Sequence, residues 1–283
     1  MTGIVVHGGA GRIPKEMQED HRRGVARAAS IGWDALEHGA VVAVVAAVRY
    51  MEGVAPFNAG VCSFPNSDGI IEMDAVVMDD ELRTGAVAGI TGVRHPVDAA
   101  LAVMRHSRCV LLAGEGGRRF ALEHGVEGCP PEDLLVPEQL DRWGVEWKGA
   151  PGDTVGAVAL DRHGRLAAAA STGGTIRSPP GRVGDVPVPG AGVYVVRRLG
   201  AACATGRGED IMRVMLARRT LDILETAGPE MAAERAIGEM EGLVDGKGGI
   251  IVLDAAGTVG VGRNTKHMPW AAITDEGEMM GGL

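Results

Sequence analysis

The chain has 283 residues and a formal net charge of -9, and 46% of its residues are hydrophobic. This length and apolar content are enough to bury a sizeable core, so a folded globular protein is expected. Lysine and arginine are scattered along this acidic chain rather than clustered, which argues against a nucleic-acid partner.

The predicted elements of the first half begin with a strand that leads into helices. In chain order they are a strand at Gly3–His7, helices at about Gln18–Glu37 and Ala40–Met51, strands at 72–80 and 84–91, and helices at about Pro96–His106 and Glu115–His124. A short polar turn joins the two strands, so they are expected to be antiparallel. A Pro-rich, acidic passage then leads to Asp153 and is the best linker candidate.

The second half returns to strands on both sides of a helical region. The predicted elements are strands at 154–161 and 165–172, an ordered Gly- and Pro-rich loop at 173–192, helices at about Glu209–Thr226 and Pro229–Gly242, and strands at 248–254, 258–264 and 270–274. Strands and helices both arrive in pairs. This order favours antiparallel sheets covered by helical layers over a doubly wound parallel sheet.

The cysteines and the first residues indicate a cellular compartment. Cys62, Cys109, Cys129 and Cys203 form no CxxC pair and are too few for a disulfide scaffold, so packed thiols in a reduced cytoplasmic protein are expected. The opening MTGIVVHGGAG lacks the basic region and long apolar stretch of a signal peptide. No segment reaches the ~18 uninterrupted apolar residues of a membrane span, so no membrane partner is expected.

Common catalytic and nucleotide-binding motifs do not fit this sequence. HGGAG at 7–11 is too short for GxGxxG, and GTVGVGRNTK at 257–266 lacks the GK[ST] ending of a phosphate loop. Neither HExxH nor GxSxG occurs. The remaining histidines of interest, His7, His95, His124 and His267, are expected to be turn or surface residues.

Thr154, in PGDTVGAVALD, suggests a different chemistry. A threonine can catalyse hydrolysis without a histidine if its own α-amine, with a pKa near ~7.7 to 8.0, accepts the proton of its hydroxyl. Thr154 would have to become an N-terminus by cleavage of the Asp153–Thr154 bond, which its hydroxyl could itself attack. The alternative is that Thr154 only begins a strand, where threonine is favoured.

Several ordered blocks resemble the type 2 (plant-type) L-asparaginase and isoaspartyl peptidase family of N-terminal nucleophile (Ntn) hydrolases. They are HGGAG at 7–11, FNAGVCS at 57–63, EMDAVVMD at 72–79, GAVAGITGVRHPV at 85–97, DTVGAVALD at 153–161, STGG at 171–174, PGRVGD at 180–185 and ATGRGE at 204–209. The resemblance runs nearly end to end. It implies an α+β fold, a four-layer αββα sandwich of two mainly antiparallel sheets between helical layers, formed by residues 1–283 as a single domain.

The resemblance also implies roles for named residues. Thr154 matches the nucleophile, freed by self-cleavage into chains 1–153 and 154–283, and Thr172 matches the threonine beside it. Thr205 and Gly206 match an oxyanion hole that also contacts substrate, and Asn58 matches an asparagine near the nucleophile.

Arg182 and Asp185 match the pair that binds the α-carboxylate and α-amine of a substrate, as a guanidinium fork and a carboxylate suit those groups. The alternative is a mutual surface salt bridge.

The same resemblance implies that no cofactor is needed, apart from a structural sodium ion. Its ligands would be backbone carbonyls of the loop 51–61, from Met51, Glu52, Val54, Phe57, Ala59 and Val61. The family further implies an (αβ)2 assembly of two cleaved pairs. Four features depart from the family pattern and affect substrate range most: Cys62, Arg177, Val186 and the segment VVRRL at 195–199.

The implied activity is cleavage of a β-amide to release L-aspartate, from the small-molecule substrates L-asparagine or a β-aspartyl (isoaspartyl) dipeptide. Asp153 before the nucleophile is shared with the glycosylasparaginase branch, so a related amidase with that or another amide specificity is one alternative. A homologue that folds but never cleaves is a second alternative.

Overall fold

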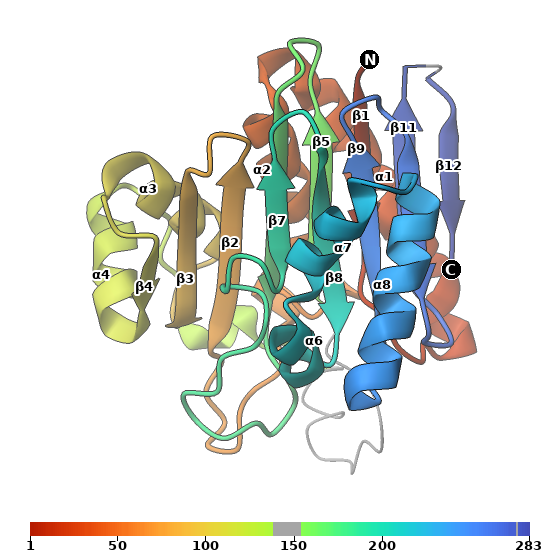
Figure 1. Ribbon diagram of the computed structural model, residues 1–283. Helices are drawn as coiled ribbons and strands as arrows, with labels where there is room; N and C mark the ends of the chain where they lie inside the picture. Colours follow the sequence, from red (N-terminus) through yellow and green to blue (C-terminus); the bar gives the residue numbers. More distant parts are fainter. Residues whose placement is uncertain (138–153, 276) are drawn as a thin grey trace.

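Two β-sheets lie face to face in the computed structural model, with helices on their outer sides (Figure 1). The structure describes residues 1–137, 154–275 and 277–283, so the linker candidate before Asp153 lies largely outside the described residues. In sheet order, the first sheet contains β12 (Met279–Gly282), β11 (Trp270–Thr274), β1 (Gly3–His7), β5 (Val155–Leu160), β6 (Leu166–Thr172), β2 (Met73–Asp79), β3 (Thr84–Ile90) and β4 (Leu111–Ala113). The second contains β10 (Val259–Arg263), β9 (Gly248–Asp254), β8 (Gly200–Gly206) and β7 (Val193–Val196).

The neighbouring strands are antiparallel in both sheets, except that β3 and β4 are parallel. The outer face of the first sheet is covered by α1 (Gln18–Ala35), α2 (Ala40–Glu52), α3 (Pro96–His106) and α4 (Gly114–Glu123). The second sheet is covered by α6 (Gly208–Val214), α7 (Leu216–Leu224) and α8 (Pro229–Val244). Single 3-10 turns occur at Lys15–Met17, Leu36–His38, Gly60–Cys62 and Pro131–Leu134. The four-layer αββα sandwich expected from the resemblance is confirmed.

Alternation along the strands divides the interior into three apolar layers. In β5, Val155, Ala157 and Ala159 pack against the first helical layer. Val158 and Leu160 point the other way, into the layer between the two sheets. In β8, Ala201 and Cys203 face this middle layer, whereas Ala202 and Ala204 face α6 to α8. Within one strand, residues an even number of positions apart therefore face the same layer, and such residues are described below as having the same parity.

Local signals account for most element boundaries. Proline occupies the first position of both α3 and α8, where its missing N–H has no helical partner to lose. The break between the first two helices comes at Gly39, whose φ of 108° suits glycine. The N–H of Ala40 at the start of α2 then donates to Asp161 Oδ2 at 3.2 Å. The predicted hairpins β2–β3 and β5–β6 are both confirmed.

Several local predictions differ from the structure, and the short strands β4 and β12 were not predicted. Residues 193–196 and 200–206 form the β7–β8 hairpin, for which no strands were predicted. The single helix expected over Glu209–Thr226 is two helices, because Met215 adopts a left-handed conformation with φ of 53° between α6 and α7. Among the described residues, no helix combines the length and apolar character required to cross a bilayer.

Candidate active site

Thr154 lies directly before β5, at the lower end of the sandwich in Figure 1, where β8 ends. It is buried, and it has the same strand parity as Val158 and Leu160, so its side chain faces the second sheet. Its predecessor, Asp153, lies outside the described residues. Thr154 therefore stands at the edge of the middle layer rather than in the helical layer.

Thr172 is adjacent to Thr154 across the β5–β6 ladder. The last pair of that ladder is Val155 with Ser171, so the next residue on each strand brings the two threonines opposite one another. Thr172 has the parity of Ala168 and Ala170, which face the second sheet. Its Oγ1 accepts the N–H of Gly174 at 3.1 Å, so this side chain also shapes the turn that follows β6.

The prediction that His7 and His95 are turn or surface residues is wrong. His7 is fully buried at the end of β1, paired with Gly156, and its Nε2 lies 3.2 Å from Cys203 Sγ. Burial lowers the pKa of His7 to about 3, although a hydrogen bond with the main chain of Thr154 opposes this shift. His7 is thus a neutral neighbour of Thr154. The available signal was the apolar strand before it, in which Val5 and His7 share a face.

His95 is also buried, and its Nδ1 lies 3.3 Å from Glu52 Oε2 behind the first sheet. The other Glu52 oxygen accepts the N–H of Val97 at 2.9 Å. Burial raises the pKa of the Glu52 carboxyl. This pair connects the end of α2 to the start of α3. By contrast, His124 is exposed at the end of α4 and His267 is partly exposed, as predicted.

Thr205 lies on the second sheet, and its side chain faces the middle layer, as that of Thr154 does from the first sheet. It shares the parity of Ala201 and Cys203 and is fully buried, and its Oγ1 has no hydrogen-bond partner among the described residues. A buried hydroxyl without a partner costs free energy, which makes it a candidate for contact with a ligand.

The backbone of Gly206 is directed away from β9. Arg207 N–H donates to Lys247 O at 2.9 Å on the β9 side, and Ala204 N–H donates to Gly192 O at 2.8 Å on the β7 side. Because these bonds alternate along a strand, Gly206 N–H points to the β7 side, beyond the last β7–β8 pair. Its φ is 140°, and a Cβ there would lie 2.4 Å from Gly248 Cα, so only glycine fits.

Arg182 and Asp185 converge on the start of α6. A Cβ added at Gly208 would lie 2.8 Å from Asp185 Oδ1 and 2.9 Å from Arg182 Nη2. Arg182 Nε donates to Glu209 Oε1 at 3.0 Å, whereas Asp185 is buried and its Oδ2 has no partner among the described residues. The alternative of a mutual surface salt bridge is therefore wrong. Burial raises the pKa of Asp185 to about 7.

Asn58 joins two loops at this end of the sandwich. Its Nδ2 donates to Gly174 O at 2.7 Å, its Oδ1 accepts the N–H of Phe64 at 2.9 Å, and its main-chain O accepts the N–H of Gly173 at 2.9 Å. The amide thus holds the loop after α2 against the turn that follows Thr172.

The structure brings the predicted residues to one end of the sandwich. Thr154 and Thr172 belong to the first sheet, Thr205 and Gly206 to the second, and Arg182 and Asp185 to the loop that crosses between them. Together they offer the Thr154 hydroxyl, the Thr205 hydroxyl, which has no partner among the described residues, the Gly206 N–H, and a guanidinium beside a carboxylate. Such a set can bind a zwitterionic amino acid and stabilise a negative oxygen that develops near Thr154.

Comparison with known proteins identifies the family of the chain. The family model described as asparaginase matches residues 1–281. The chain belongs to this asparaginase family. Its relatives include the isoaspartyl peptidase/L-asparaginases of Danio rerio (42% identity, covering 99% of this chain and 94% of the relative), Xenopus laevis (40%, covering 96% and 92%) and Homo sapiens (41%, covering 96% and 93%).

The features that depart from the asparaginase family pattern lie in different places. Val186, which follows Asp185, is buried in the middle layer, and Cys62 is buried in the loop that carries Asn58. Arg177 has a left-handed conformation with φ of 56° in the loop after β6. Segment 195–199 includes the β7–β8 turn, at the opposite end of β8 from Thr205. Its arginines are thus remote from the candidate site.

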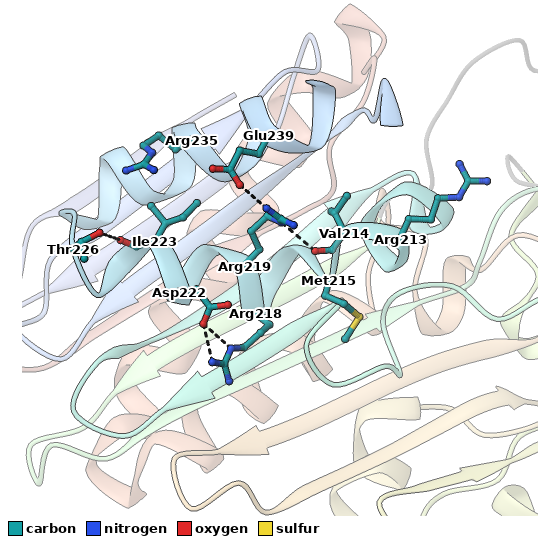
Figure 2. Close-up of a pocket in the computed structure, with 10 residues that line it drawn as sticks. All are labelled: Arg213, Val214, Met215, Arg218, Arg219, Asp222, Ile223, Thr226, Arg235 and Glu239. Atoms are coloured by element: carbon teal, nitrogen blue, oxygen red, sulfur yellow. Dashed lines mark hydrogen bonds and ion pairs between the residues drawn. The ribbon is translucent and has the colours of Figure 1, made fainter. Parts of the chain in front are cut away.

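Away from the candidate site, the described part of the chain offers little that would hold a metal ion or a small ligand. Among residues 1–137, 154–275 and 277–283, no three or more His, Cys, Asp or Glu side chains are arranged to hold a metal ion. A surface groove of about 570 Å³ lies on the outside of α7 and α8, where Arg218 pairs with Asp222 and Arg219 with Glu239 (Figure 2). This groove belongs to the outer helical layer and is separate from the Thr154 end.

Proposed function

We propose that the chain is a self-processing threonine amidohydrolase that releases L-aspartate from L-asparagine and from β-aspartyl (isoaspartyl) dipeptides. Membership of the asparaginase family and relatives named isoaspartyl peptidase/L-asparaginase support this activity. The observation that carries it is a pair of buried polar atoms, Thr205 Oγ1 and Asp185 Oδ2, which have no hydrogen-bond partner in the described part of the chain. They lie at the end of the sandwich where Thr154 precedes β5.

Maturation would precede catalysis. Attack of Thr154 Oγ on the carbonyl of Asp153 breaks the C–N bond between them, passes the hydroxyl proton to the departing nitrogen and leaves Asp153 as an ester on Oγ. Water then hydrolyses this ester, which gives chain 1–153 with a terminal carboxylate and chain 154–283. The product carries a free α-amine on Thr154, and this amine is the only base that the mechanism requires. The position of Thr154 directly before the buried strand β5 supports the proposal, because the ladder that begins at Val155 would hold the new terminus.

In the hydrolytic step, the Thr154 amine takes the proton of its own hydroxyl while Oγ attacks the side-chain carbonyl of the substrate. The carbonyl oxygen becomes negative, and the Thr205 hydroxyl and Gly206 N–H donate to it. Collapse breaks the C–N bond, and the leaving nitrogen takes the proton from the amine. Water then attacks the ester on Thr154 and loses its proton by the same route, which frees L-aspartate.

Substrate recognition would rest on Arg182 and Asp185. The guanidinium binds the α-carboxylate with its remaining N–H donors, and the Asp185 carboxylate accepts from the α-ammonium. Asn58 and Thr172 hold the turn beside the nucleophile through Gly174.

The decisive experiment is denaturing electrophoresis with mass spectrometry of the purified protein. We expect two fragments with a new amino terminus at Thr154, and turnover of L-asparagine and a β-aspartyl dipeptide. Thr154→Ala should leave one intact chain without activity. The control is Thr220→Ala, which removes a buried threonine that donates to Leu216 O at 2.8 Å in α7 and should still cleave and turn over.

Other results would contradict the proposal in distinct ways. A single intact band without activity would mean a non-cleaving homologue. Cleavage followed by turnover of a glycosylated asparagine alone would mean a glycosylasparaginase-like amidase.

We further propose an (αβ)2 assembly in the cytoplasm, supported by family resemblance and by four cysteines that remain free thiols. A structural sodium ion would be held by backbone carbonyls of the loop 51–61. The loop is tightly wound, since a Cβ at Gly60 would lie 2.4 Å from Glu52 O. Carbonyl oxygens suit a hard cation, which would hold the loop that carries Asn58 without taking part in the reaction.

A further inference from the structure

Asp74 on β2 is a buried carboxylate at the candidate site to which the proposed reaction gives no role. It pairs with Thr172 across the β2–β6 ladder, and it has the parity of Val76 and Met78, which face the second sheet. Thr154, Thr172 and Asp74 therefore stand side by side on three neighbouring strands and face the same layer.

The local backbone is built around this carboxylate. The β2–β3 register shifts between Met73 and Ala75, so β3 carries an extra residue opposite Asp74. Gly89 lies in this bulge with φ of 58°, and its N–H donates to Asp74 Oδ1 at 2.8 Å. The bulge thus turns a ladder N–H toward the acid.

The other oxygen of Asp74 contacts the proposed substrate clamp. Gly184 N–H donates to Asp74 Oδ2 at 3.2 Å. Gly184 stands between Arg182 and Asp185, and a Cβ there would lie 2.9 Å from Arg182 Nη1. The carboxylate therefore fixes the main chain from which both clamp side chains project.

The charges around Arg182 and Asp185 affect the pKa values of Asp74 and Asp185. Burial raises the pKa of Asp74 to about 6, with Gly89, Gly184 and Arg182 opposing and Glu72 adding to the rise. Asp185 faces Arg182, Asp74, Glu209 and the Cys203 thiol, and the negative charge on Asp74 contributes to its raised pKa.

We propose that Asp74 is the positioning residue of the amino-acid clamp. Through Gly184 it holds Arg182 and Asp185 in register with Thr172 and Thr154, and it thereby sets substrate affinity rather than the rate of the chemical step. This inference rests on the proposed function of Arg182 and Asp185.

The test compares Asp74→Asn with Asp79→Asn. Asp79 is a matched control on the same strand, equally buried, with Oδ1 accepting the N–H groups of Glu81 and Arg83, but at the far end of the sandwich. An Asn side chain has only one acceptor oxygen, so Asp74→Asn loses one of the two backbone bonds.

We expect Asp74→Asn to raise KM for L-asparagine about tenfold while kcat stays within about threefold and self-cleavage persists. The acid limb of kcat/KM should move to lower pH, because removing the charge at position 74 lowers the pKa of Asp185. Asp79→Asn should leave KM and the acid limb unchanged.

Asp74→Glu keeps the charge with altered geometry, so it should raise KM but keep the acid limb, and it serves as the test if Asp74→Asn fails to fold. An unchanged KM in the folded Asp74 variants, or the same change in Asp79→Asn, would overturn the role of Asp74. A wild-type protein without turnover of any β-aspartyl amide would instead overturn the proposed function.

Discussion

The two ends of the sandwich differ in whether the compared buried polar groups all have hydrogen-bond partners. At the far end, Asp161 Oδ1 accepts the N–H groups of His163 and Arg165, and its Oδ2 accepts that of Ala40. Asp80 is bound there by Arg165 and Arg197. At the Thr154 end, by contrast, Thr205 Oγ1 and Asp185 Oδ2 have no partner among the described residues.

This difference separates a stabilising end from a binding end. Buried polar groups in folded proteins are normally hydrogen-bonded, so the far end follows the rule and contributes to stability. The Thr154 end leaves donors and acceptors unsatisfied, which costs stability and leaves interactions for a ligand to complete. Substitutions at the two ends should therefore separate activity from stability.

The largest effect is expected for Thr205→Val, which keeps the shape of the side chain and removes only its hydroxyl. Loss of one oxyanion donor should lower kcat by ~100-fold to ~1000-fold in the cleaved enzyme. The free energy of unfolding should not fall, because no described residue is hydrogen-bonded to this hydroxyl. Thr220→Val is the matched control: its hydroxyl is bonded to Leu216 O, so kcat should persist while stability drops by about 1 kcal/mol. Equal kcat values for the two variants would contradict the comparison.

Asp185→Asn should lower kcat/KM by roughly 100-fold, since a charge-assisted bond to the substrate ammonium is lost. The stability of this variant should rise above that of wild type, although its activity falls. The pKa of this carboxyl rises from 3.8 to about 7 in the fold, so its contribution to stability is present below pH 3.8 and is lost as pH rises through about 7.

The Asn variant should consequently unfold at a higher temperature than wild type near pH 8, and this difference should fade toward pH 4. Thermal unfolding across that range checks the sign. A variant less stable than wild type at high pH would show that Asp185 has a stabilising partner.

Asp80→Ala should produce the reverse pattern at the far end. The variant leaves Arg165 and Arg197 without their buried partner, so the free energy of unfolding should fall by about 2 kcal/mol. Because this network is remote from Thr154, kcat and KM should match wild type. Denaturant titration and steady-state kinetics on the same preparation test both statements, and a loss of kcat would refute the separation of the two ends.

The smallest effect is expected for Arg197→Ala. This side chain is 49% exposed and shares Asp80 and Glu81 with Arg165, so its loss should cost less than about 1 kcal/mol. The cost should shrink further in about 1 M NaCl, where exposed charges are screened. A loss of stability as large as that of Asp80→Ala would mean that Arg197, rather than Arg165, is the main partner of Asp80.

Sequence patterns alone determined much of this fold. The hairpins β2–β3 and β5–β6 and the helices α1, α2, α3 and α8 follow from periodicity, glycine breaks and proline starts, which are properties of neighbouring residues. Ordered motifs placed Thr154, Thr172, Thr205, Arg182 and Asp185 in one site, and the structure brings them to one end of the sandwich.

The missed strand β7, Val193–Val196, carries β-branched residues that favour a strand, but the other missed features lacked such local signals. The strand β8, Gly200–Gly206, reads GAACATG and is buried on both faces, so it shows no polar–apolar alternation, and Thr205 is its one β-branched residue. The break between α6 and α7 at Met215 has no glycine or proline that would predict it from the sequence. The buried position of His7 likewise depends on a second sheet that lies nearly 200 residues away in sequence, at Cys203.

Local sequence thus determined which segments become strands and helices wherever neighbouring side chains carry the signal. Only the tertiary structure decided which of their polar groups find partners. The bonds that Asp161 accepts from Ala40 and Asp80 from Arg165 result from packing between distant segments. The same packing leaves Thr205 Oγ1 and Asp185 Oδ2 without a partner among the described residues. Hydrogen bonding and burial are set by that packing, and they distinguish the stabilising end from the binding end.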